Sequence, residues 1–161
     1  MVMYTTYYQS PVGVMQINGT DDIITSISFE DALGEPTATV PALLNECVEQ
    51  FVEYFAGTRQ TFTVPTAQTG TEFQQRVWGE LAKISFGETF SYMDVALRLG
   101  DKNSIRAVGN ANGKNKLNII IPCHRVIGSN GKLVGYGGGL WRKQWLLEHE
   151  AKYAHGILTL F

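Results

Sequence analysis

The pattern of apolar residues changes near residue 65, and this change constrains the possible folds more than any other feature of the sequence. Residues 3–9, 13–19 and 23–29 are short, rich in β-branched and aromatic residues, and separated by turn sequences. Segments of this kind predict a small antiparallel sheet. Residues 65–71 have the composition of a linker. We therefore expect an α/β protein of the α+β type, with a sheet-and-helix domain over residues 1–65 and a mainly helical domain over residues 71–161.

A helix is expected to complete the first domain. Pro41 suits the first residue of a helix, because an N–H at that position would have no acceptor within the helix. Apolar residues then repeat at helical spacing from Leu44 to Phe55, and Gly57 suits the stop. Cys47 lies on this apolar stripe, so we interpret it as a core residue.

The second domain should contain several helices. Residues 71–74 fit a capping box at the start of a helix whose apolar face reaches Ile84 and which Gly87 would end. Further helices are expected over residues 91–100, from an Asn103-Ser104 cap to about Asn112, and from about Leu140 to His149, with Glu150 at the C-terminal end of the last. The two short helices suit a helix-turn-helix, whose second helix enters the major groove in DNA-binding examples. An ordinary hairpin of two helices is the commoner alternative.

The charge of the chain is unevenly distributed. Residues 1–70 contain eight acidic residues and one basic residue, whereas residues 71–161 contain seven acidic and twelve basic residues. A polyanion would therefore meet the second half rather than the first. Five of the basic residues fall between Arg98 and Lys116, a stretch with one acidic residue, Asp101. This clustering favours contact with nucleic acid over a uniformly solvated surface.

The segment from residue 119 to residue 127 contains the strongest candidate for a reactive group. Its three isoleucines, residues 119–121, predict a buried strand. Cys123 follows shortly after, beside His124 and Arg125. Two neighbours that can carry positive charge favour a lowered thiol pKa and a thiolate nucleophile. A buried structural cysteine is the alternative, and the spacing alone gives both equal weight.

A glycine-rich segment, residues 134–139, follows a turn at residues 128–131. Four glycines around Tyr136 would let the backbone wrap a flat ligand. A flexible loop is the alternative.

Composition excludes several classes of protein. The two cysteines provide no disulfide framework and favour a reducing compartment, which is the cytoplasm, or the nucleus in a eukaryote. The histidines at 124, 149 and 155 show no paired metal-ligand spacing, so we expect neither a metal nor a cofactor. No apolar run reaches the roughly 18 residues that a membrane span needs, and the N-terminus lacks the pattern of a secretory signal.

The motif Pro122-Cys123-His124-Arg125-Val126-Ile127 resembles the active-site motif of the O6-alkylguanine-DNA alkyltransferases, also called methylated-DNA–protein-cysteine methyltransferases. The resemblance covers residues 70–150 strongly, and the first 65 residues fit by length and element order. Similar residues recur in the family's order at Phe86-Gly87-Glu88, Ser91-Tyr92, Arg106-Ala107-Val108-Gly109, Asn115, Gly135-Tyr136-Gly137-Gly138, Arg142-Lys143, Trp145-Leu146-Leu147 and His149-Glu150. The order of several separated motifs makes a chance match very improbable.

The resemblance implies a chemistry for five residues. A thiolate at Cys123 would take the alkyl group from guanine O6, and the reaction would be irreversible, so that each molecule acts once. Glu150 would orient His124, which would accept the Cys123 proton through a water molecule. Tyr92 would donate toward the purine N3 and assist the leaving guanine. Asn115 would brace the turn near the histidine. Activity on O4-methylthymine is left open.

The resemblance also implies how the substrate is bound. The partner would be double-stranded DNA containing O6-alkylguanine, bound by a monomer, with the damaged base rotated out of the helix. Arg106 would fill the space that the base leaves. The expected DNA contacts are Arg106, Tyr92, Ser91, Lys114 and Arg125, and the expected guanine pocket consists of Val126, Tyr136, Gly137 and Gly138.

The chain departs from the family pattern at three positions, and two rival functions have to be weighed against alkyl transfer. Lys116 stands where the family commonly has proline, Asn118 stands where some members have proline, and Gly137 stands where some have serine. Alkyltransferase-like proteins bind lesions without transfer and commonly have tryptophan in place of the cysteine, so Cys123 argues against that class. A thiol hydrolase using Cys123 with His149 or His155 is the second rival, and it gives the basic second half no role.

Overall fold

The computed structural model describes residues 2–156, which form two compact units. The first unit comprises the residues up to Gln68 together with Lys116–Asn118. The second comprises Thr69–Asn115 and the residues from Ile119 onward. No pattern in the sequence indicates that a short segment of the second half belongs to the first unit.

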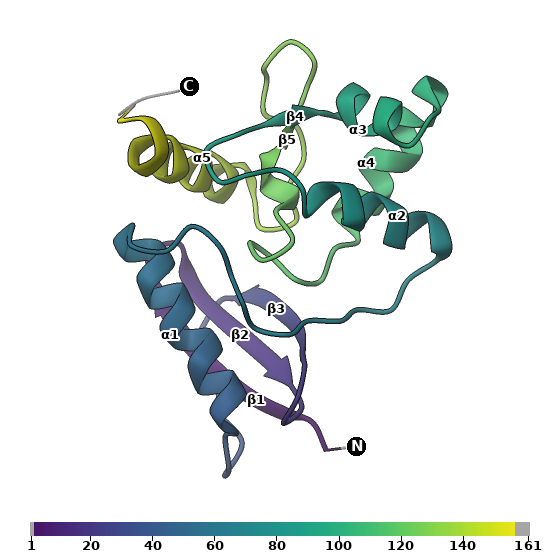
Figure 1. Ribbon diagram of the computed structural model, residues 1–161. Helices are drawn as coiled ribbons and strands as arrows, with labels where there is room; N and C mark the ends of the chain where they lie inside the picture. The colour runs from purple at the N-terminus through teal and green to yellow at the C-terminus, as the bar shows by residue number, and fades with distance from the viewer. Residues whose placement is uncertain (1, 157–161) are drawn as a thin grey trace. The chain divides into compact units, whose positions relative to one another are not determined.

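The first unit contains a three-stranded antiparallel sheet. Strands β1 (Tyr4–Ser10), β2 (Gly13–Gly19) and β3 (Ile24–Glu30) follow one another in space as in the sequence, and Figure 1 shows them in purple and blue. The register pairs Tyr8 with Met15 and Ile17 with Ile27. This confirms the predicted meander.

Helix α1 (Ala42–Ala56) packs against this sheet (Figure 1). Pro41 is the residue before the helix rather than its first residue, and Gly57 ends it in the left-handed conformation with φ of 83°. Phe51 and Tyr54 are fully buried on the apolar face of α1. Cys47 is also buried there, and burial raises the pKa of its thiol to about 12. The interpretation of Cys47 as a core residue is therefore confirmed.

The segment Lys116–Asn118 extends the edge of the sheet at β3. The N–H of Ile27 donates to the carbonyl oxygen of Lys116 at 2.8 Å, and the Asn118 side-chain amide donates to the carbonyl oxygen of Ile27 at 2.7 Å. The N–H of Lys116 donates to Oε1 of Gln68 at 2.9 Å. A proline at position 116 would lack this N–H, and a proline at 118 would lack the amide. The two departures from the family pattern therefore each supply a hydrogen bond within the first unit.

Two capping boxes set the starts of the first helices of the second unit. Thr71 caps α2 (Glu72–Leu81) together with Gln74, as the sequence predicted. Ser91 caps α3 (Tyr92–Arg98) together with Asp94, and the chain turns at Gly100 with φ of 88°. Helix α2 ends at Leu81, so the prediction that Gly87 would end it is wrong. The chain turns between the two, and Gly87 has a φ of 85° in that turn.

The third helix begins differently from the prediction. A 3₁₀ turn, η1 (Lys102–Ser104), precedes α4 (Ile105–Gly113), and the carboxylate of Asp101 accepts the Asn103 N–H at 2.9 Å. Ser104 makes no side-chain cap of α4, so the expected Asn103-Ser104 cap is wrong. The negative charge of Asp101 also interacts favourably with the N-terminal end of a helical turn.

Helix α5 (Leu140–His155) is longer than predicted. Residues 150–155 contain no helix breaker, and the helix continues to a left-handed C-cap at Gly156. Glu150 therefore lies inside α5 rather than at its end. It faces the core of the unit and is buried.

The segment before the cysteine is not a strand. Residues 118–121 form turns, and Ile119 has a φ of 72°, which is a rare conformation for a β-branched residue. A one-turn 3₁₀ helix, η2 (Cys123–Arg125), follows, and β5 (Val126–Ile127) then pairs in parallel with β4 (Phe90–Ser91). The prediction of a buried strand over 119–121 was right about burial of Ile119 and wrong about backbone conformation.

One buried cluster of the second unit is built from α2, α3 and α4 together with the segment around Cys123, and α5 adds the buried residues Leu146, Leu147 and Ala151 to the core of the unit. The buried members of the cluster are Val77, Trp78, Leu81, Ile84, Val95, Ala96, Val108, Ala111, Cys123 and Val126. Within residues 2–156, the structure contains no helix with the length and apolarity that a membrane crossing requires.

Candidate active site

Two asparagines, one in the last turn of α4 and one two residues beyond the helix, hold the backbone that carries Cys123. Nδ2 of Asn112 donates to the Cys123 carbonyl oxygen at 3.3 Å, and Nδ2 of Asn115 donates to the Ile121 carbonyl oxygen at 2.8 Å. The Cys123 N–H also donates to the Ile121 carbonyl oxygen at 2.8 Å, which closes a tight turn. Asn115 was expected near this turn on resemblance. Asn112 was not, because the sequence offers no signal that separates it from an ordinary polar helix residue.

His124 and Arg125 converge on Glu150. Nε2 of His124 lies 2.8 Å from Oε2 of Glu150. Nε and Nη2 of Arg125 donate to Oε1 and Oε2 of Glu150 at 2.7 and 2.9 Å, and Nη1 donates to the Ile84 carbonyl oxygen at 2.6 Å. Glu150 is 1% exposed and Arg125 is 6% exposed. The structure therefore brings together the predicted His124–Glu150 pair and adds the guanidinium as a third member.

The charge states of Glu150 and His124 follow from their burial and from the contacts that they make. Burial alone would raise the pKa of Glu150, but the hydrogen bonds and charges of His124 and Arg125 outweigh burial and hold that pKa far below its ordinary value. Burial lowers the pKa of His124, even though Glu150 acts in the opposite direction. The imidazole is therefore neutral, and the hydrogen-bond network assigns its proton to Nε2, which donates to Glu150. Its Nδ1 is buried without a hydrogen-bond partner among residues 2–156, and it carries the free lone pair.

The pKa of the Cys123 thiol differs from the prediction. Cys123 is 4% exposed, and burial raises its pKa, so the expected lowering is wrong for the resting protein. The two neighbouring side chains do not lower this pKa, because Glu150 neutralises the charge of Arg125 and His124 is uncharged. A hydrogen bond from Asn115, the charge of Lys143 and nearby backbone groups act against burial without overcoming it. A thiol in this environment needs a base to remove its proton.

The Arg125 side chain is not placed as the resemblance implied. All of the described guanidinium hydrogen bonds are directed inward, to Glu150 and Ile84. A side chain this deeply buried cannot reach a DNA phosphate without breaking the ion pair. The structure therefore argues against the predicted DNA contact of Arg125.

The glycine-rich segment lies beside Tyr92. The hydroxyl of Tyr92 donates to the Val134 carbonyl oxygen at 3.1 Å, and the ammonium of Lys143 donates to the same oxygen at 3.0 Å. Tyr136 packs against the core that contains Cys123 and Val126. Electrostatic coupling between Cys123 and both tyrosines contributes to a raised pKa for Tyr92 and Tyr136, although burial is the larger cause. The pocket residues Gly137 and Gly138 belong to this same segment.

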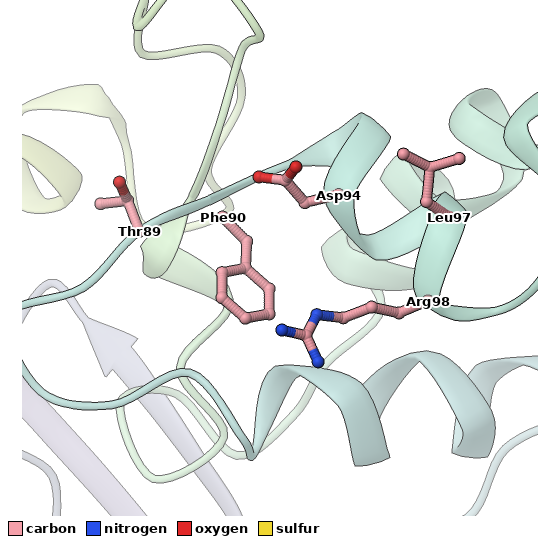
Figure 2. A pocket seen from close by; sticks show the side chains of 5 residues that line it. All are labelled: Thr89, Phe90, Asp94, Leu97 and Arg98. Atoms are coloured by element: carbon pink, nitrogen blue, oxygen red, sulfur yellow. The ribbon is translucent and has the colours of Figure 1, made fainter.

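The predicted DNA contacts on α3 and α4 are partly exposed. Arg106 and Lys114 have exposed side chains, whereas the Ser91 hydroxyl is occupied as the cap of α3. Arg98 lies 4.4 Å from the centre of the Phe90 ring and is one wall of a hollow of about 550 Å³ (Figure 2). Thr89, Asp94 and Leu97 complete that lining, and none of the predicted site residues belongs to it. Lys116, the last member of the basic stretch, is part of the first unit.

No three histidine, cysteine, aspartate or glutamate side chains within residues 2–156 are grouped so that they would hold a metal ion. The described site consists of a buried thiol, a neutral histidine and a carboxylate that is neutralised by an arginine. The fold and the site define a two-unit α+β protein with a cysteine-centred site.

Comparison with known proteins gives the family. The family model described as the ribonuclease-like domain of 6-O-methylguanine DNA methyltransferase matches residues 3–68, and its DNA binding domain matches residues 72–152. The chain belongs to the methylated-DNA–protein-cysteine methyltransferase family. A methylated-DNA–protein-cysteine methyltransferase of Mycolicibacterium paratuberculosis is 44% identical over 165 residues, which cover 100% of this chain and 99% of the relative.

Solved structures agree with this assignment. The crystal structure of the Mycobacterium tuberculosis O6-methylguanine methyltransferase superposes with a TM-score of 0.84 at 42% identity, over 94% of each chain. The structure of Mycobacterium tuberculosis OGT in complex with DNA superposes with a TM-score of 0.83 at 42% identity, over 91% of this chain and 92% of that one.

Proposed function

We propose that this protein repairs DNA by transferring the alkyl group of O6-methylguanine irreversibly to Sγ of its own Cys123. The observation that carries the proposal is the buried hydrogen bond between His124 and Glu150, next to Cys123 in the chain. The relatives named above are methyltransferases whose acceptor is a protein cysteine. The chain offers the thiol, the base and the group that orients the base.

The proton moves first. His124 keeps the Nε2 proton that it donates to Glu150, so Nδ1 accepts the Cys123 proton through a bridging water. The imidazolium that forms is stabilised by the charge of Glu150, which stays ionised because its pKa lies far below neutral pH. Arg125 fixes the carboxylate with two further hydrogen bonds and so fixes the orientation of the imidazole.

The thiolate then attacks the alkyl carbon. A bond forms between Sγ and that carbon, the bond from the carbon to O6 breaks, and its electron pair remains on the guanine. Tyr92 donates toward the purine N3 and supports the leaving base, which ends as neutral guanine once it takes up the proton released by the thiol. In this step the Tyr92 hydroxyl gives up its hydrogen bond to the Val134 carbonyl oxygen and donates to the base instead. The product thioether is stable, so the reaction occurs once per molecule.

The second unit also supplies the means of binding duplex DNA. Helices α3 and α4 pack against each other and are joined by residues 99–104, and this contact supports the proposal that they act as a helix-turn-helix on DNA. Arg106 is exposed near the start of α4, where it can fill the space left by a base that is rotated out of the duplex. Lys114 lies at the other end of α4 and contacts phosphate. Val126, Tyr136, Gly137 and Gly138 line the pocket for the rotated guanine.

The contacts of the other histidines disfavour the hydrolase alternative. The His149 ring stacks on Trp145 with 5.0 Å between ring centres, and Nε2 of His155 lies 3.0 Å from the Gly87 carbonyl oxygen. His124 is the histidine that carries a carboxylate partner beside the thiol.

We place the repair reaction in the cytoplasm, carried out by a monomer without a cofactor.

The test is intact-mass measurement after incubation with duplex DNA containing O6-methylguanine. The parent protein should gain the mass of one methyl group on Cys123. Cys123→Ser should gain none and should keep its affinity for DNA, because the thiol performs the chemistry and basic residues supply the affinity. Methylation found on Cys47, with Cys123 unmodified, would overturn the assignment.

A further inference from the structure

Asn112 is a buried polar side chain whose acceptor oxygen the mechanism above does not use. It lies in the last turn of α4 and is 6% exposed, although asparagine is mostly exposed in proteins. Its Oδ1 is enclosed and accepts no hydrogen bond from any group within residues 2–156. Buried acceptors without a donor are rare and costly, so each one needs an explanation in terms of structure or function. A donor that arrives with the substrate would be such an explanation.

The neighbours of Asn112 fix the orientation of its amide. Nδ2 donates to the Cys123 carbonyl oxygen at 3.3 Å. A carbonyl oxygen can only accept, so the amide atom that faces it is the nitrogen, and Oδ1 is the other terminal atom. Asn112 also interacts with Tyr92: burial and the charge of an ionised Cys123 raise the pKa of Tyr92, and a side-chain hydrogen bond with Asn112 acts in the opposite direction. The side chain therefore lies between the backbone of the reactive cysteine and the tyrosine that the mechanism directs to the purine.

The chemistry of guanine supplies a donor at this place. In the reaction proposed above, Tyr92 donates to N3 of the purine. The 2-amino group is bonded to C2, directly beside N3, and carries two N–H donors on the same edge of the base. Gly109 lies three residues before Asn112 on α4, and a Cβ atom there would lie 3.8 Å from Cε1 of the Tyr92 ring. The part of α4 that carries Asn112 thus adjoins the tyrosine that marks the N3 edge.

Other acceptors around the cysteine already have a partner or a role. The Val134 carbonyl oxygen accepts from two donors, and so does the Ile121 carbonyl oxygen. The carboxylate of Glu150 is bound to its two buried neighbours. Nδ1 of His124 has no hydrogen-bond partner among residues 2–156, but the mechanism uses it to accept the thiol proton. Of these acceptors, only Oδ1 of Asn112 has neither a partner nor a role.

We propose that Asn112 is a specificity-determining residue whose Oδ1 accepts an N–H of the 2-amino group of the alkylated guanine. Nδ2 stays on the Cys123 carbonyl oxygen and so keeps Oδ1 in place. Oδ1 is enclosed in the resting protein, and it meets the base when the Tyr92 hydroxyl leaves the Val134 carbonyl oxygen, as the reaction already requires. The inference deepens the proposed function and rests on it for the orientation of the base. A purine without the 2-amino group would leave Oδ1 unsatisfied in the complex.

The test compares the rates of methyl transfer to the full-length protein from two duplexes, followed by intact mass. One duplex contains O6-methylguanine, and the other contains O6-methylhypoxanthine, which is the same base without its 2-amino group. The measured quantity is the ratio of the first rate to the second. Asn112→Leu removes the amide and keeps a side chain of similar size. Asn110→Leu is the matched control, because Asn110 lies exposed on the same helix.

The parent should react faster with O6-methylguanine than with O6-methylhypoxanthine. Asn112→Leu should lower the ratio on the order of tenfold, because it removes one hydrogen bond to the base. The variant also loses its hold on the Cys123 backbone, but that loss slows both reactions and cancels in the ratio, as does any difference in reactivity between the two bases. Asn112→Asp keeps an acceptor and should keep the parent preference, while its acidic group beside the forming thiolate slows both reactions. Asn110→Leu should leave the ratio unchanged.

A second measurement tests the contact without the chemistry. Cys123→Ser cannot accept the methyl group, so its relative affinity for the two duplexes reports how well the base is bound. It should bind the O6-methylguanine duplex more tightly, and Cys123→Ser/Asn112→Leu should lose most of that preference.

A folded Asn112→Leu protein with the parent ratio would overturn the inference, because a residue that only holds the backbone would slow both reactions equally. If Asn112→Leu does not fold, the parent and Cys123→Ser decide: equal rates from the two duplexes, together with equal affinities, would overturn it as well. Parent protein that takes up no methyl group, while Cys123→Ser still prefers the O6-methylguanine duplex, would count against the proposed function alone.

Discussion

Replacing Glu150 with glutamine should destabilise the protein strongly, because Glu150 is the counter-charge of a buried guanidinium. Arg125 directs Nε and Nη2 to the two carboxylate oxygens at 2.7 and 2.9 Å. A glutamine keeps one oxygen as an acceptor and replaces the other with an N–H₂ group that faces the guanidinium. The change thus leaves a buried charge without compensation and adds a donor opposite a donor.

The size of the destabilisation depends on whether the lost hydrogen bond or the unpaired buried charge dominates. Loss of one net hydrogen bond would cost about 1 kcal/mol. Removal of one partner from a buried ion pair costs about 3–5 kcal/mol, because the remaining charge stays desolvated. Both side chains here are at least nine-tenths buried, so the larger figure applies. We expect the free energy of unfolding of Glu150→Gln to fall by about 3–5 kcal/mol.

Urea denaturation at pH 7, followed by tryptophan fluorescence, measures this loss. Glu148→Gln is the matched control on the same helix, since Glu148 accepts a hydrogen bond from Gln144 and forms no ion pair among the described residues. It should change stability by no more than about 0.5 kcal/mol. The double variant Arg125→Met/Glu150→Gln should recover much of the loss because it leaves no unpaired charge. A loss below about 1 kcal/mol for Glu150→Gln would refute the account of the buried pair.

The same ion pair predicts a pH dependence. The pKa of Glu150 is lowered by folding, so its stabilising contribution is complete above the value of about 4.5 that glutamate has when unfolded. The contribution declines as the pH falls below that value. The stability difference between the parent and Glu150→Gln should therefore be constant from about pH 6 to 8 and should shrink progressively below about pH 4.5. A difference that stays constant into acid would contradict the assigned charge state.

Three further predictions concern DNA and the turn that carries the thiol. Arg106→Ala should slow repair of duplex DNA by about ten- to a hundredfold more than it slows reaction with free benzylguanine, because a free base needs no flipping; equal losses on both substrates would contradict the role. DNA affinity should fall with salt with a log–log slope of about −3 to −4, and Lys114→Ala should reduce the slope by no more than about one; a salt-independent affinity would exclude the basic surface. Asn115→Ala removes one of the two donors to the Ile121 carbonyl and should cost about 1 kcal/mol in urea denaturation. It should also shift the pH profile of iodoacetamide alkylation of Cys123 upward, and a parent-like profile would contradict its effect on the thiol.

Local signals in the sequence predicted local structure well. The capping pattern at Thr71 and Gln74 lies within one helical turn, so the residues that form the hydrogen bonds are also the residues that display the pattern. The three strands of the first unit alternate with turns over short distances, and their antiparallel order needs no long connection. The interpretation of Cys47 succeeded for the same reason, because its helical neighbours define the apolar face.

Features that depend on distant partners could not be predicted in this way. Glu150 lies 25 residues from Arg125, and no pattern near either residue indicates that they meet. This pairing changed the role of Arg125 and the direction of the Cys123 pKa. Residues 119–121 have the composition of a strand, but the chain turns at Ile119 into a conformation that composition disfavours. The resemblance named the reacting residues, while the physical environment of the thiol required the structure.

The attachment of Lys116–Asn118 to β3 has a consequence for the order in which the newly made chain can acquire its native structure. A ribosome releases the strands, α1 and the linker about 50 residues before it releases position 118. Throughout that interval the N–H and carbonyl groups of Ile27 face solvent at an open sheet edge, which is a site where strands of other molecules can pair. A fragment ending at residue 68 would keep that edge open permanently. The N-terminal half should therefore aggregate more readily on its own than within the whole chain.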